Sequence, residues 1–247
     1  IEEFYNTLME WNTDRDLYHA IGYLIASKKV PGYKKDSLIS LVKYSMQHDK
    51  SSFWQHVTNR IKASVNIVPS ELRYDQHYDQ IFNVLLLFNV ETYRTTLSID
   101  DFYPFKQHKA NQWSLEHIHA QNSEGLDQTK KEQWLKWLEL HLPVLEVLKD
   151  KDLFKNKKSD IEQIISDVNN TFKEKLSWEL FSDYFAKVTH ILSDDTEQSD
   201  SETHGLANMA LLSRPNNSAL NSSAFVVKRN MILDLDKDGS FVPICTR

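Results

Sequence analysis

Two short segments, far apart in the sequence, depart from the helical periodicity of the rest of the chain. The first begins at Trp113 and reads Trp-Ser-Leu-Glu-His-Ile-His-Ala-Gln-Asn, and the second begins at Ala207 and reads Ala-Asn-Met-Ala-Leu-Leu. Apolar residues and short length predict one β-strand in each segment. Pro215, followed by two asparagines, then predicts a helix opening. The order strand, strand, helix within an otherwise helical chain predicts a mainly α protein that contains a small ββα motif.

Helices are expected to build the remainder. Five glycines and six prolines among 247 residues are too few for an all-β architecture, and apolar residues recur at helical spacing through residues 1–97. The run Ile81–Phe88 is apolar on every face, which predicts the buried central helix of this region. Amphipathic stretches at residues 127–192, the first of them ending at Pro143, predict a helical insertion within the ββα motif. We therefore expect a helical domain at 1–97 and a second domain at 98–247.

Three connections are predicted from local composition. Tyr103-Pro-Phe105 favours an extended entry into the first strand, because the residue before a proline avoids the helical conformation. Residues 194–203 contain five acidic side chains and no basic one, which predicts a solvated loop. Asp238-Gly239 predicts a hairpin turn.

Composition limits the function classes. The single cysteine, Cys245, excludes an internal disulfide and the paired cysteines of a zinc knuckle, and it fits a reducing cytoplasm. No apolar run approaches the roughly 18 residues of a membrane-spanning helix, so we expect no membrane partner. A net charge of −6 argues mildly against a general nucleic-acid binder, although Lys109, Lys228 and Arg229 flank the two segments and suit contacts to DNA phosphates.

Taken together, the two segments resemble the HNH (ββα-metal, His-Me finger) nuclease site. The chemistry fits, because phosphodiester hydrolysis at neutral pH needs a base and a group that stabilises the leaving oxygen. In this resemblance His117 is the catalytic base, and Glu116 and Asn217 hold one Mg²⁺ or Mn²⁺ through oxygen atoms. Asn208 is catalytic in the sense that it braces the hairpin and orients the imidazole.

Other polar residues of the two segments are candidates to line this site. They are His119, His204 and Asn221, the last of which shares a helical face with Asn217 because four residues separate them. A His-x-His pair, His117 and His119, is also compatible with a transition metal, so a zinc hydrolase is an alternative. Each of these residues has an ordinary structural interpretation as well, and the pattern alone leaves the choice open.

A closer resemblance is carried by Trp-Ser-Leu-Glu-His-Ile-His-Ala-Gln-Asn from Trp113, with Asn-Met-Ala-Leu-Leu and Asn-Ser-x-Leu-Asn following far downstream. This combination resembles the C-terminal nuclease domain of GmrSD-type modification-dependent (type IV) restriction enzymes, over residues 102–122 and 204–243. The resemblance implies a bacterial anti-phage endonuclease that acts on double-stranded DNA, including modified phage DNA. It also implies an N-terminal nucleotidase domain in the same protein.

The chain departs from that family pattern in three ways. Glu116 stands where the family has aspartate, Ala120 stands where it has proline, and Ala207-Asn208-Met209 replaces Gly-Asn-Leu. The Asp-Gly-Gln-Gln-Arg signature of the nucleotidase domain is absent from this sequence, so we expect a fragment that holds the helical middle and the nuclease domain. An alternative is a catalytically inactive helical DNA-sensing or interaction module with an HNH remnant.

Overall fold

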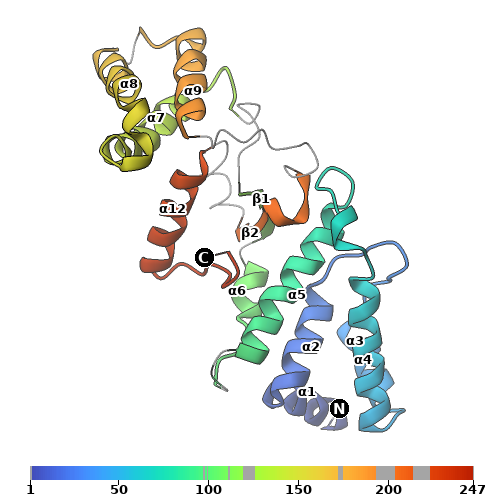
Figure 1. Ribbon diagram of the computed structural model, residues 1–247. Coiled ribbons are helices and arrows are strands. Elements are labelled where there is room, and N and C mark those ends of the chain that lie inside the picture. The colour runs from blue at the N-terminus through green and yellow to red at the C-terminus, as the bar shows by residue number, and fades with distance from the viewer. Residues whose placement is uncertain are drawn as a thin grey trace. The chain divides into compact units, whose positions relative to one another are not determined.

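The computed structural model describes residues 2–96, 98, 100–110, 112–118, 126–171, 175–192, 204–213 and 223–246. These residues are mainly helical and include one small two-stranded antiparallel sheet, as Figure 1 shows. The helices are α1 (Glu2–Thr13), α2 (Arg15–Ala26), α3 (Leu38–Ser45), α4 (Lys50–Ser64), α5 (Tyr78–Thr96), α6 (Phe105–Ala110), α7 (Lys131–Leu148), α8 (Lys158–Asn170), α9 (Trp178–Leu192) and α12 (Phe225–Lys237). The strands are β1 (Trp113–His117) and β2 (Met209–Ser213), and short 3-10 helices cover Pro69–Glu71, Asp152–Lys157 and Leu206–Asn208.

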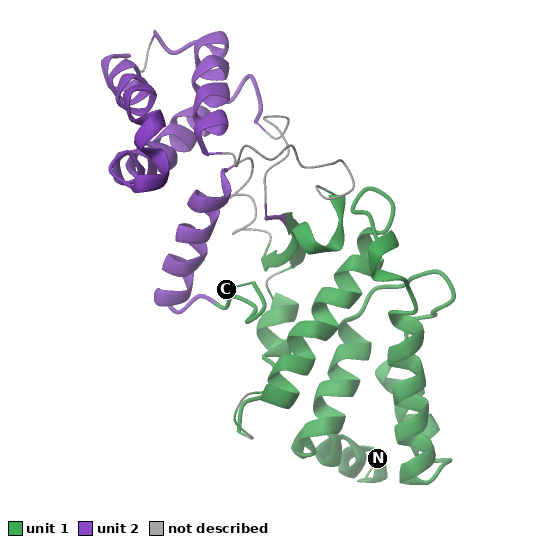
Figure 2. Cartoon of the chain, viewed as in Figure 1, with its two compact units in different colours: residues 1–116, 204–215, 241–247 green, residues 117–203, 216–240 purple. Residues whose placement is uncertain are grey.

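The chain divides into two compact units, each assembled from segments that are distant in sequence (Figure 2). The first unit contains residues 1–116, 204–215 and 241–247, and the second contains residues 117–203 and 216–240. This division does not coincide with the expected boundary between residues 97 and 98. None of the described helices is both long enough and apolar enough to cross a membrane.

Helix α2 contacts α1, α4, α5 and α6 in the first unit, and it buries Tyr23 and Leu24 completely. Its start is fixed by Asp14, whose carboxylate accepts a hydrogen bond from the Leu17 N–H at 2.9 Å. Glycine at position 22 permits the approach of α6, because a Cβ atom there would lie 2.2 Å from Cε2 of Phe105.

The small sheet and the N-terminal helices share one hydrophobic core. Strand β2 lies against α5, and the core of the helices includes Trp113 and Leu115 from β1 and Leu211 from β2. Helix α5 buries one face in this core, but its Phe88 is 60% exposed. The helix predicted from the run Ile81–Phe88 therefore lies in the core of the first unit, with Phe88 exposed at its surface.

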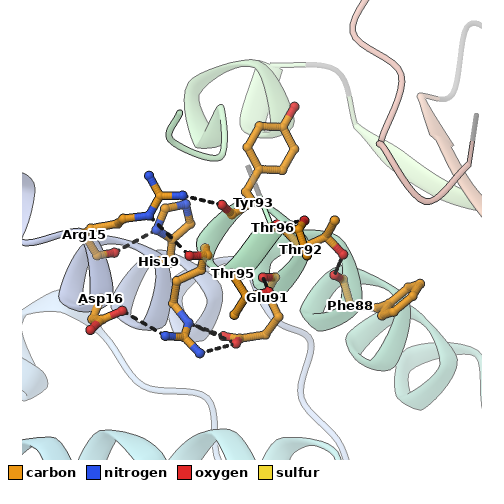
Figure 3. Close-up of polar contacts among 10 residues, drawn as sticks. Arg15, Asp16, His19, Phe88, Glu91, Thr92, Tyr93, Thr95 and Thr96 are labelled. Carbon is orange, nitrogen blue, oxygen red and sulfur yellow. Dashed lines mark hydrogen bonds and ion pairs between the residues drawn. The ribbon is translucent and has the colours of Figure 1, made fainter. Parts of the chain in front are cut away.

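An arginine from α2 binds the carboxyl end of α5. Figure 3 shows Arg15 reaching the Tyr93 carbonyl, to which it donates a hydrogen bond of 2.5 Å, and it also donates to the carbonyl of Arg94 at 3.3 Å. Arg94 in turn forms ion pairs with Asp16 at 2.9 Å and with Glu91 at 2.7 Å. A cation at the end of a helix satisfies carbonyls that have no partner within the helix, so this network joins the start of α2 to the end of α5.

The segment before β1 differs from the extended connection that we expected. Phe105 begins α6, and the Pro104 carbonyl accepts a hydrogen bond from the His108 N–H at 3.0 Å. Proline is tolerated at a helix start because no N–H is needed there. Tyr103 before it is completely buried, and its own N–H donates to Nε2 of His19 at 3.0 Å.

The second unit has its own core. The described residues between 127 and 192 are mainly helical, and α7, α8 and α9 contact one another around fully buried side chains that include Leu145, Ile161, Phe181 and Val188. Helix α12 contacts α7. The expected loop at residues 194–203 lies outside the described residues.

Helix α7 continues through Pro143, where the sequence predicted its end. Trp137 and His141 are buried before the proline, and Leu145 is buried after it in the same core. Pro143 itself is on the exposed side of the helix. Burial of apolar side chains on both sides of Pro143 therefore outweighs the loss of one main-chain hydrogen bond.

The end of α12 corrects another expectation. Asp238-Gly239 forms a helix C-cap instead of a hairpin turn: Gly239 has φ +78°, its N–H donates to the Asp236 carbonyl at 3.1 Å, and the Ser240 N–H donates to the Leu235 carbonyl at 2.9 Å. These are the two hydrogen bonds of a Schellman motif, in which glycine adopts the left-handed conformation. At its other end α12 begins at Phe225, and the helix opening expected at Pro215 lies outside the described residues.

Candidate functional site

Pairing of β1 with β2 brings the two unusual segments of the sequence into one antiparallel sheet. Glu116 is the fourth of the five residues of β1. Asn208 immediately precedes β2, in a 3-10 turn in which its N–H donates to the Gly205 carbonyl at 3.0 Å. The sequence placed Asn208 in the strand itself, so its position shifts by one residue. Asn208 is 6% exposed, and its side chain is therefore held inside the first unit.

Glu116 is a buried carboxylate with tyrosines beside it. It is 8% exposed, and burial, the neighbouring Tyr78 and the negative charge of Glu116 all raise the pKa of Tyr74. The Tyr78 hydroxyl accepts a hydrogen bond from the Leu115 N–H at 3.1 Å, which fixes α5 to β1 next to Glu116. Sequence reasoning did not identify Tyr74 or Tyr78, because aromatic residues next to an apolar helix are ordinary core residues.

The chain preceding α5 pairs with the chain preceding β2. The Tyr74 N–H donates to the His204 carbonyl at 2.9 Å, and Arg73 forms an antiparallel bridge with Gly205. His204 is half-buried. The main chain around His204 is thereby held two positions before the 3-10 turn that carries Asn208.

His117 ends β1 and belongs to the second unit. Successive side chains of a strand point to opposite faces. Glu116 and His117 are the last two residues of β1, and the chain bends at Ile118. His117 is half-buried, and its Nε2 atom is shielded from solvent.

Lys228 of α12 is bound to the main chain of His117. Its ammonium group donates a hydrogen bond of 2.7 Å to the His117 carbonyl, and the residue is only 3% exposed. We expected Lys228 to contact a DNA phosphate, whereas the structure places its charge inside the second unit. Arg229 and Lys109, expected in the same role, are exposed.

A buried histidine anchors the start of the helix that carries Lys228. Nε2 of His141 accepts a hydrogen bond from the N–H of Ala224, the N-cap residue of α12, at 3.1 Å, and its Nδ1 lies 2.7 Å from the Trp137 carbonyl. These partners require the proton on Nδ1, because a carbonyl can only accept. Burial lowers the pKa of His141 to about 4, so the ring is neutral at pH 7. Sequence reasoning missed it because His141 lies on the apolar stripe of α7.

The described residues contain no cluster of three or more histidine, cysteine, aspartate or glutamate side chains that could hold a metal ion. Glu116 would supply a carboxylate oxygen and Asn217 a carboxamide oxygen, and oxygen donors of this kind suit Mg²⁺ or Mn²⁺. Asn217, His119 and Asn221 lie outside the described residues.

Protein-family models, curated proteins and solved structures were all compared with the chain, and none of them matches it. The functional assignment therefore depends on the chemistry of these side chains.

Proposed function

We propose that this chain carries a metal-dependent endonuclease site that hydrolyses phosphodiester bonds in DNA. The observation that supports it most is the pairing of β1 with β2, because this pairing puts the segments of Glu116 and Asn208 into one sheet with His117 at a strand end. The resemblance to modification-dependent restriction enzymes extends the proposal to double-stranded phage DNA with modified bases, in a bacterial cytoplasm, within a protein that also has a nucleotidase domain.

Each residue has a defined role in the proposed reaction. The neutral imidazole of His117 takes a proton from water, and the resulting hydroxide attacks phosphorus as the phosphate ester bond breaks. Glu116 and Asn217 would hold Mg²⁺ or Mn²⁺, which would supply neutralisation of the charge on the phosphate and on the leaving oxygen. Asn208 positions the hairpin, and Lys228 positions the His117 main chain through its 2.7 Å hydrogen bond.

Two kinds of substitution should fail in different ways. His117→Ala removes the base and leaves the oxygen ligands, so we expect the rate of DNA cleavage to fall by about 10²- to 10⁴-fold while metal binding persists. Glu116→Gln and Asn217→Ala should weaken metal binding, and a higher Mg²⁺ concentration should restore part of the cleavage. The measurements are nicking of plasmid DNA and of glucosylated phage DNA, with calorimetric titration of Mn²⁺.

The neighbouring Asn216→Ala is the matched control for Asn217→Ala and should leave both readouts near those of the parent. Unchanged cleavage by His117→Ala, on a DNA that the parent cuts, would contradict the mechanism. Binding of DNA without cleavage by the parent at any Mg²⁺ or Mn²⁺ concentration would favour the inactive DNA-sensing module instead. Stoichiometric zinc in the purified protein would favour the zinc hydrolase.

A further inference from the structure

The first unit contains a cavity that the proposed nuclease chemistry does not use. Its volume is about 650 Å³, and α1, α2, α3, α5, α6 and the start of β1 contribute residues to its wall. Pockets that bind small molecules have volumes of about 300 to 1,000 Å³. Of the residues assigned to the nuclease, only Lys109 lies on this wall.

Aromatic side chains form much of the wall. They come from five different elements and include Trp11, Tyr18, Phe82, Phe105 and Trp113. His108 extends this surface: its ring stacks on that of Trp113, with centroids 5.3 Å apart and an angle of 8° between the planes. Burial lowers the pKa of His108 to about 4, so it adds a neutral ring at pH 7. Such a wall suits a planar ring.

The charge of the wall has one sign. Lys28, Lys35 and Lys109 line the cavity, and the described lining residues include no aspartate or glutamate. None of these three lysines forms an ion pair within the described part of the chain. Burial lowers the pKa of Lys35, and the positive charges of Lys28 and Lys29 lower it further. In a chain with a net charge of −6, this local excess of positive charge favours an anionic ligand.

Trp113 supplies an independent sign of a missing polar partner. It is 7% exposed, and its indole N–H is buried without a hydrogen-bond acceptor among the described residues. Buried donors in native proteins nearly always have an acceptor. The adjacent Gln112 also lines the cavity and has φ +46°, which is uncommon for a residue other than glycine. Both features occur where β1 begins, on the wall of the cavity.

We propose that this cavity binds a small organic phosphate that carries a planar aromatic ring. The ring lies among the aromatic side chains of the wall, and the phosphate lies at the lysines, with Lys28 and Lys35 as its principal partners. Lys28 is already fixed against this wall, since its ammonium nitrogen is 5.0 Å from the centre of the Phe82 ring. A ligand with both a ring and an anionic group contacts the aromatic side chains and the lysines at once, whereas a ligand with only one of these groups contacts only one part of the wall.

Calorimetric titration of the full chain, in buffer with EDTA, tests the proposal with 1-naphthyl phosphate. We expect saturable binding of one molecule per chain, with binding of 1-naphthol and of inorganic phosphate each at least about tenfold weaker, because each lacks one of the two recognised parts. Adenosine monophosphate and dodecyl phosphate then separate the sources of such a ligand. If adenosine monophosphate binds and dodecyl phosphate does not, the natural ligand is of the nucleotide type. If dodecyl phosphate binds more tightly than both 1-naphthyl phosphate and adenosine monophosphate, the aromatic part of the proposal is overturned.

Matched variants locate the binding. The double substitution Lys28→Gln and Lys35→Gln should weaken binding of 1-naphthyl phosphate by about tenfold. The control, Lys43→Gln with Lys62→Gln, removes the same charge from exposed positions of α3 and α4 outside the cavity and should leave binding unchanged. Ala26→Phe, which adds volume to the wall, should abolish binding while thermal unfolding shows a folded protein. Absence of saturable binding, or equal loss in both double variants, would overturn the proposal.

Discussion

At the scale of single residues, Lys228 shows that burial changes the role that a charged side chain can have. A lysine near a nuclease motif suggests contact with phosphate, but this one is 3% exposed and donates to the His117 carbonyl. Burying an ammonium group is unfavourable unless it finds acceptors. Its bond to the residue at the end of β1 therefore supports a positioning role for Lys228.

We expect Lys228→Met to lower the free energy of unfolding of the second unit by about 2 kcal/mol, since hydrogen bonds from charged groups contribute about 1.5 to 3 kcal/mol. Denaturant unfolding, followed by far-UV circular dichroism, measures this loss. The exposed neighbour Arg229→Met is the control and should change stability by less than about 0.5 kcal/mol. Equal effects of the two substitutions would show that the buried hydrogen bond has no special importance.

At the scale of secondary-structure elements, α7 passes through a residue that normally ends a helix. Its buried residues Trp137, His141 and Leu145 fall on both sides of the exposed Pro143. The proline is therefore a local defect that the surrounding core maintains in a helical conformation. The main chain there lacks one N–H donor.

Pro143→Ala should restore that donor and raise the free energy of unfolding by about 1 to 3 kcal/mol, because proline is strongly unfavourable within a helix. Thermal unfolding of the full chain provides the measurement. Lys136→Ala, at another exposed position of α7, serves as the comparison and should have an effect near zero. Loss of stability in Pro143→Ala would mean that the defect itself is needed by the fold.

At the scale of the whole molecule, each compact unit contains a histidine that is kept neutral by burial. The pKa of His108 in the first unit and that of His141 in the second are both lowered to about 4 from an ordinary value of 6.5. Well above pH 6.5 these two histidines are neutral in both the folded and the unfolded chain. Between pH 6.5 and 4 the unfolded chain binds protons that the folded chain does not, so acid destabilises the fold.

A difference of this size corresponds to about 3 kcal/mol per histidine across that interval. We therefore expect the free energy of unfolding to fall as the pH decreases from 6.5 to 4, beyond the contribution of the carboxylates. Denaturant titrations at a series of pH values measure the slope. His108→Gln and His141→Gln should each flatten it, whereas the exposed His48→Gln should leave it unchanged. A parallel slope in all four proteins would refute this origin of the acid sensitivity.

Local patterns in the sequence predicted the elements of this protein well. The mainly helical character follows from apolar residues at helical spacing, since that spacing produces a buried face whatever the helix contacts. The two strand segments were recognisable because their apolar runs are short and lie apart from that periodicity. The candidate base and carboxylate, His117 and Glu116, were likewise visible as adjacent polar residues on an otherwise apolar strand.

The tertiary structure alone decided how those elements are used. Whether Pro143 ends α7 and whether Lys228 faces solvent both depend on contacts with residues distant in sequence. The same holds for the cavity, whose wall combines residues of five helices and the start of β1. The sequence determines secondary structure through interactions over one or two helical turns, whereas burial, charge pairing and cavities arise from long-range packing that no local pattern encodes.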